Sequence, residues 1–205
     1  MLFVFIVAGE AGENLFMERN VMWSTWNGPG LEHLYLRENH EQIAADGLIL
    51  GVKDQAPFRV HYEITCDLQW RVRRVHVQLL SGQKQALTLH GDGEGNWISA
   101  AGESLASLHG CVDIDISESP FTNTLPIRRA AFKPGVSLTL TVVYLAVPEL
   151  TIEPAQQRYT CLEKSPTGGL YRFESLSSGF RADLPVDADG LVLDYPGVFR
   201  RVGEW

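Results

Sequence analysis

Hydrophobic and polar residues alternate along most of this 205-residue chain, and the 3.6-residue period of an amphipathic helix is nearly absent. In the segment FRVHYEIT, the residues Phe58, Val60, Tyr62 and Ile64 fall on one face, and polar or charged residues fall on the other. Because successive side chains of a strand point to opposite faces, this pattern predicts a half-buried strand. The segment SLTLTVVYLAV, residues 137–147, predicts another strand on the same grounds.

A change of phase interrupts the alternation in LQWRVRRVHVQLL, residues 68–80. Hydrophobic positions alternate up to Val72, and the pattern resumes at Val75 after the pair Arg73 and Arg74. An extra residue inserted into one strand has this effect, so we expect a β-bulge or a sharp bend there. Glycine-containing turns between alternating segments predict three hairpins, centred on residues 91–97, 165–169 and 189–190.

About a dozen predicted strands recur at the spacing typical of sandwiches and barrels. Short helices are candidates only at residues 14–22 and 105–108. We therefore expect an all-β fold in which a mainly antiparallel, curved sheet forms an incomplete or closed barrel around a central cavity, because a dozen strands exceed what side chains alone fill. No linker or change in composition divides the chain, so we expect one domain at residues 21–205, preceded by an N-terminal extension at residues 1–20.

The composition is that of an ordinary globular protein, with 45% hydrophobic and 20% charged residues. A formal net charge of −8 argues against nucleic acid as a partner, because nucleic-acid-binding surfaces are basic. The apolar start MLFVFIVAG lacks the basic residues of a signal peptide and is too short to span a bilayer. We therefore expect no transmembrane segment, no cleaved leader and a cytoplasmic location.

Motifs of common active sites are missing from the sequence. The cysteines Cys66, Cys111 and Cys161 form no CxxC pair, and the six histidines show no metal-ligand spacing. Neither the GxSxG nucleophile motif nor a nucleotide-binding glycine loop is present. We expect no metal and no cofactor, and we assign no catalytic residue.

The segment CVDIDISESPFTNTLPIRR, residues 111–129, contains the most unusual arrangement of charges. Asp113 and Asp115 share one face of a predicted strand, and Arg128 and Arg129 follow a polar loop. If this pair of arginines is extended, one side chain points to each side, so one arginine can bind an acid and the other can face a ligand. An adjacent guanidinium would keep the paired carboxylate ionised at neutral pH. The alternative is a purely structural ion pair.

Aromatic residues provide the remaining candidates. Trp97, Tyr159, Tyr171 and Tyr195 lie at predicted strands or turns. Tryptophan and tyrosine have an apolar body and a polar end, which suits the mouth of a pocket, although core packing is the commoner use of large aromatic residues.

Three segments, CVDIDISESPFTNTLPIRR, QRYTCLE and GLVLDYPGVFRRV, resemble the bacterial glycolipid-binding protein family, and the likeness extends over residues 26–202. The resemblance implies a curved antiparallel β fold similar to that of periplasmic lipoprotein carriers, which hold acyl chains in an apolar concavity. It leads us to expect a non-enzymatic binding protein for a glycolipid or another acyl-containing amphipathic ligand. The expected ligand-binding residues are Asp113, Asp115, Asn123, Arg128, Arg129, Trp97, Tyr159, Tyr171 and Tyr195. Two alternatives remain: a hydrolase or isomerase that uses Asp113 or Asp115 in the same cavity, and a structural or interaction module with a filled barrel.

Overall fold

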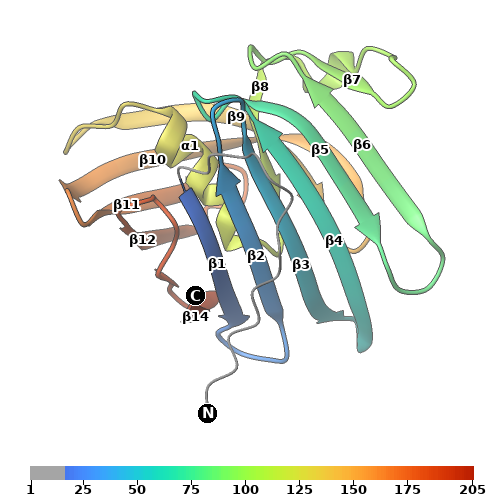
Figure 1. The fold of residues 1–205 in the computed structure, drawn as a ribbon, viewed down its shortest axis with the longest axis horizontal. Coiled ribbons are helices and arrows are strands. Elements are labelled where there is room, and N and C mark those ends of the chain that lie inside the picture. The colour runs from blue at the N-terminus through green and yellow to red at the C-terminus, as the bar shows by residue number, and fades with distance from the viewer. Residues whose placement is uncertain (1–16) are drawn as a thin grey trace.

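The computed structural model describes residues 17–205, which form two β-sheets with a short helical segment between them (Figure 1). The nine-stranded sheet has the order β13 (Asp194–Tyr195), β14 (Phe199–Glu204), β1 (Met17–Thr25), β2 (Leu31–Glu38), β3 (Ile43–Lys53), β4 (Ala56–Cys66), β5 (Val72–Leu79), β6 (Gln85–Gly91) and β7 (Trp97–Ser99). The five-stranded sheet has the order β12 (Arg181–Asp187), β11 (Gly168–Ser175), β10 (Thr151–Ser165), β9 (Ser137–Ala146) and β8 (Cys111–Ile116). Within residues 17–205 neither sheet closes on itself, so the expected all-β, curved antiparallel fold is confirmed in its open form.

Every strand pair is antiparallel except β8 and β9, which are parallel. Antiparallel neighbours can be joined by a tight hairpin, whereas parallel neighbours need a longer connection that returns to the same end of the sheet. The connection from β8 to β9 contains the 3-10 helix η2 (Pro120–Asn123) and the helix α1 (Thr124–Arg129). Their buried side chains fill the space between the two sheets, so this connection belongs to the core.

The hydrophobic positions of the alternating sequence pattern are the buried side chains of the strands. Phe58, Val60, Tyr62 and Ile64 on β4 are all buried, as the sequence pattern predicts. The three predicted hairpins are present as the β6–β7, β10–β11 and β12 to β13 connections. The inward faces of both sheets and the helical segment form one continuous hydrophobic core.

The predicted strand at residues 68–80 is only half a strand. Asp67 accepts backbone hydrogen bonds from Gln69 and Arg71, both at 3.0 Å, and so closes a turn around Trp70, whose φ is +62°. β5 therefore begins at Val72. The expected irregularity appears as a register shift in the pairing of β4 with β5, between Thr65 and Cys66.

One of the two short-helix predictions is confirmed and the other is wrong. Residues 17–22 of the first candidate belong to β1, and the second is a single turn of 3-10 helix, η1 (Ala106–Leu108). Of the expected N-terminal extension, residues 1–16 lie outside the described residues, and residues 17–20 belong to β1. Among residues 17–205, the helices are all too short to cross a lipid bilayer.

Candidate functional site

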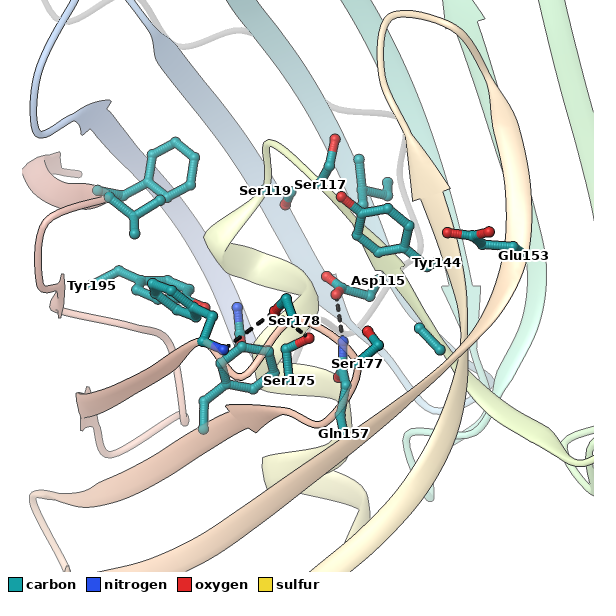
Figure 2. A pocket seen from close by; sticks show the side chains of 17 residues that line it. Asp115, Ser117, Ser119, Tyr144, Glu153, Gln157, Ser175, Ser177, Ser178 and Tyr195 are labelled. Carbon is teal, nitrogen blue, oxygen red and sulfur yellow. Dashed lines mark hydrogen bonds between the residues drawn. The ribbon is translucent and has the colours of Figure 1, made fainter.

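A pocket of about 410 Å³ lies between η2, strands β8 to β11 of the five-stranded sheet and the β13–β14 edge of the nine-stranded sheet, and we call it the interlayer pocket (Figure 2). Its walls come from β8, η2, β9, β10 and β11, from the turn at residues 177–180, and from residues 195–199. Eleven of its seventeen lining residues have polar side chains, while apolar atoms contribute somewhat more of the lining surface than polar atoms, so the cavity has the expected size and is amphipathic.

A carboxylate and an amide form the polar wall of the interlayer pocket. Asp115 accepts a hydrogen bond from Nε2 of Gln157 at 2.6 Å (Figure 2). It accepts a second from Oγ1 of Thr122 at 3.0 Å. Burial raises the pKa of Asp115, and these two neutral donors act in the opposite direction. Because no arginine pairs with Asp115, the expectation of a carboxylate held ionised by a guanidinium does not apply to it.

Four aromatic rings form the opposite wall. Tyr195 is at the centre, with ring centroids 6.2 Å from Phe173, 6.0 Å from Phe180 and 6.3 Å from Phe199. These separations lie in the range of favourable aromatic contacts. Their tilted and edge-on arrangement gives the pocket a broad apolar surface facing the polar wall.

Asn123 connects the pocket wall to the core. Its Oδ1 accepts a hydrogen bond from the hydroxyl of Tyr159 at 2.9 Å, and its Nδ2 donates to the carbonyl of Pro120 at 3.3 Å. Tyr159 is buried behind the wall and does not line the pocket. Its hydroxyl therefore orients Asn123, which does line it.

A buried carboxylate that sequence reasoning missed lies behind Ser119, another lining residue. Glu32 is fully buried and accepts hydrogen bonds from the hydroxyls of Ser119 at 2.6 Å and Tyr62 at 2.5 Å. Burial raises the pKa of Glu32 from its ordinary value of 4.5 to about 7. Its second oxygen, Oε2, has no hydrogen-bond partner among residues 17–205.

Glycine at position 47 makes this arrangement possible. Gly47 on β3 lies beside Tyr62 on β4, and a Cβ at that position would overlap the tyrosine ring. The ring therefore crosses β3 freely to reach Glu32 on β2. The signal in the sequence was the acid at an inward position of LEHLYL, on the same face as Leu34 and Leu36.

Asp113 and Arg129 form a separate ion pair beside the interlayer pocket. The guanidinium binds both carboxylate oxygens, with Nε–Oδ1 at 3.0 Å and Nη2–Oδ2 at 2.8 Å, and Asp113 is fully buried. This confirms that one arginine pairs with one acid. Burial raises the pKa of Asp113 above its ordinary value, and the hydrogen bonds and charge of the Arg129 guanidinium act against that shift.

The direction of the helical segment explains why Arg129 pairs with Asp113 and not with Asp115. The segment runs back along β8, so that Thr122 near its start contacts Asp115, and Arg129 at its end contacts Asp113. The arginine pair is not extended, because both residues belong to the last turn of α1.

The other residues expected at a binding site lie elsewhere. Trp97 is buried and donates from Nε1 to the carbonyl of Cys111 at 2.8 Å. Arg128 and Tyr171 line a second, smaller pocket. Of the nine expected ligand-binding residues, the structure thus brings Asp115, Asn123 and Tyr195 together in the interlayer pocket.

One group of metal-ligand type exists among the described residues, on the outer face of the nine-stranded sheet. It comprises Asp46 on β3 and His61 and Glu63 on β4. His61 contacts Asp46 at 3.1 Å, and Arg74 already binds Glu63 at 3.1 Å. None of these residues lines the interlayer pocket.

A sequence model of the family described as "Putative glycolipid-binding" matches residues 20–201. The chain belongs to this family. The structure is also similar to the crystal structure, at 1.80 Å resolution, of a DUF1089 family protein from Pseudomonas aeruginosa. That similarity has a TM-score of 0.74 and 35% sequence identity, and it covers 86% of this chain and 95% of the other. Comparison with curated proteins finds no match. The family resemblance drawn from the sequence is therefore confirmed.

Proposed function

We propose that this member of the glycolipid-binding family binds an amphipathic glycolipid, with the polar sugar head of the ligand in the interlayer pocket. The observation that carries the proposal is the hydrogen-bonded pair of Asp115 and Gln157 facing the aromatic wall around Tyr195. Both walls belong to one pocket, to which β8 contributes Asp115, β10 contributes Gln157 and β13 contributes Tyr195.

The chemistry of the two walls suits a sugar. Carboxylate oxygens accept hydrogen bonds from hydroxyl groups, and amide and serine groups both donate and accept. Ser117, Ser175 and Ser178 add hydroxyls to the same cavity (Figure 2). Aromatic rings supply apolar surface for the carbon-bound hydrogens of a sugar ring, and a few placed polar groups with an apolar wall are typical of small-molecule sites.

The size and polarity of the pocket favour the head of the ligand over its tail. A volume of about 410 Å³ lies near the lower end of the range for small-molecule pockets. Burying acyl chains against carboxylate and amide groups would remove hydrogen bonds that these groups make with water. We therefore place the acyl part of the ligand outside the interlayer pocket, unlike in the periplasmic lipoprotein carriers that the family resemblance implies.

A second candidate function is hydrolysis of the bound ligand, and the environment of Asp115 favours it. A carboxyl whose pKa is raised by burial can act as a general acid nearer neutral pH. Asp115 lines the pocket, where it can reach a ligand, whereas Asp113 is occupied by Arg129 and does not line it. Loss of a measured glycosidase activity on Asp115→Asn, at ligand concentrations that saturate the variant, would establish this function.

The binding proposal is tested with octyl β-glucoside below its micellar concentration, by titration calorimetry. We expect the native protein to bind it and Asp115→Asn to weaken binding at least about tenfold, as expected for loss of a hydrogen bond to a charged group. Asp183→Asn is the matched control, because Asp183 lies on the same sheet, is 41% exposed and binds Arg172 outside the pocket. Equal binding by native protein and Asp115→Asn, or no binding of the glucoside, would contradict the proposal.

A further inference from the structure

A second pocket of about 220 Å³ lies where the end of α1 meets the β10–β11 hairpin and the end of β12. We call it the hairpin pocket. It shares no lining residue with the interlayer pocket. Two cationic side chains, Arg128 and Lys164, line it.

Arg128 is held in place without an anionic partner among residues 17–205. Its guanidinium lies over the ring of Trp70, 4.9 Å from the centroid. Its stem passes under Gly190, where a Cβ would approach Cδ of Arg128 to 3.1 Å. A cation stacked on an aromatic face retains its hydrogen-bond donors, which remain available at the edge of the guanidinium plane.

Lys164 supplies a second cation from the opposite side of the hairpin pocket. Its Nζ donates to the carbonyl of Phe132 at 3.3 Å, which leaves further donors on the ammonium group. Within residues 17–205, neither Arg128 nor Lys164 forms an ion pair, whereas the adjacent Arg129 is fully paired. Two unpaired cations in one pocket are unusual in a chain whose formal net charge is −8.

The carboxylate that lines the same pocket does not neutralise these cations. Asp187 is bound by Arg201 at 2.8 Å and by Arg19 at 3.2 Å. Its other oxygen accepts backbone hydrogen bonds from Asp189 and Leu191, both at 2.9 Å. Arg19 also binds Asp189 and Glu204, and Arg201 also binds Glu204, so the cluster beside the pocket holds three carboxylates and two guanidinium groups. The positive charge that a ligand meets in the hairpin pocket is therefore that of Arg128 and Lys164.

We propose that the hairpin pocket binds a phosphoryl group, through the planar fork of Arg128 and the ammonium of Lys164. Arginine matches the geometry of two phosphate oxygens, and lysine adds a point charge. The pocket is large enough for a small anion but small for a whole lipid. This site does not depend on sugar binding in the interlayer pocket, since the two cavities have separate walls.

Titration of the protein with inorganic phosphate at pH 7 and low ionic strength, followed by NMR chemical shifts of residues around the hairpin pocket, tests the proposal. We expect saturable shifts that weaken as salt is added, because the attraction is electrostatic. Arg128→Gln and Lys164→Gln should each weaken binding about tenfold or more. Arg59→Gln, an equal change of charge at an exposed position on β4, should leave it unchanged.

Arg128 packs on the buried Trp70, so Arg128→Gln can also disturb folding. Lys164 is exposed, so Lys164→Gln tests phosphate binding without disturbing the fold. A second arm uses dihexanoyl phosphatidic acid. If the protein binds this lipid and inorganic phosphate with equal affinity, the site serves free phosphate or small phosphate esters. If it binds the lipid much more tightly, the site serves a lipid headgroup. Absence of binding in both arms, or unaltered binding by folded Lys164→Gln, would overturn the proposal.

Discussion

Replacing Arg129 with alanine is expected to lower the free energy of unfolding by roughly 3–5 kcal/mol at pH 7, the cost typical of breaking a buried ion pair from one side. The magnitude follows from burial. The Asp113 side chain has 0% exposure, and its two oxygens are held by the guanidinium at 3.0 and 2.8 Å. Without Arg129, the carboxylate is left in the core with no cation to offset its lost hydration.

A matched control exists on the five-stranded sheet. Arg172 binds both oxygens of Asp183 in the same geometry, at 2.8 and 2.9 Å, but the two side chains are 34% and 41% exposed. Arg172→Ala should therefore cost only about 0–1 kcal/mol, as exposed pairs do. The comparison isolates burial, because the bond geometry is nearly equal in the two pairs.

Urea unfolding at a series of pH values measures both variants. Burial already raises the pKa of Asp113 above its ordinary value, and losing the guanidinium raises it further. The folded variant then binds a proton at Asp113 more readily than the unfolded chain, so its deficit is largest at neutral pH and shrinks as the pH falls. Replacing both partners, Asp113→Leu with Arg129→Met, should recover much of the loss. Equal costs for Arg129→Ala and Arg172→Ala would refute the reasoning.

Two further predictions concern the buried carboxylate behind Ser119. The folded pKa of Glu32 is raised from 4.5 to about 7, so its contribution to stability is fully present below 4.5 and is lost as the pH rises through about 7. As the pH rises over that interval, the free energy of unfolding of Glu32→Gln should increase by about 3 kcal/mol relative to that of the native protein, as measured by urea unfolding. If the two proteins show parallel dependences of stability on pH, Glu32 does not titrate in this way. Gly47→Ala should lower the free energy of unfolding by about 1–3 kcal/mol, because the new Cβ overlaps the Tyr62 ring. The same substitution should lower stability less when Tyr62 is already alanine. If the effects of the two substitutions simply add, the overlap is not the cause.

Alternation between neighbouring residues determined the strands and hairpins. The pattern in residues 58–65 is a local property, because side chains at positions i and i+2 share a face whatever the rest of the chain does. The bend near Trp70 was visible as a change of phase, although the turn closed by Asp67 was not. The helix α1 escaped prediction because six residues, one of them Pro126, are too few to show a helical period.

The candidate site was only partly predictable. Asp115 and Asn123 were identified because they lie in one unusual segment of the sequence. Gln157 and Glu32 were not, because Gln157 meets Asp115 across 42 positions and Glu32 meets Ser119 across 87.

The sequence by itself therefore determined which faces of the strands are apolar, where the chain turns and to which family it belongs. The tertiary structure decided which polar side chains are buried and which partners they have. It did so through the parallel pairing of β8 with β9, which places the helical segment between the sheets. The physical reason is that strand formation depends on contacts between near neighbours, whereas a pocket depends on how separate sheets pack, and no local pattern encodes that packing.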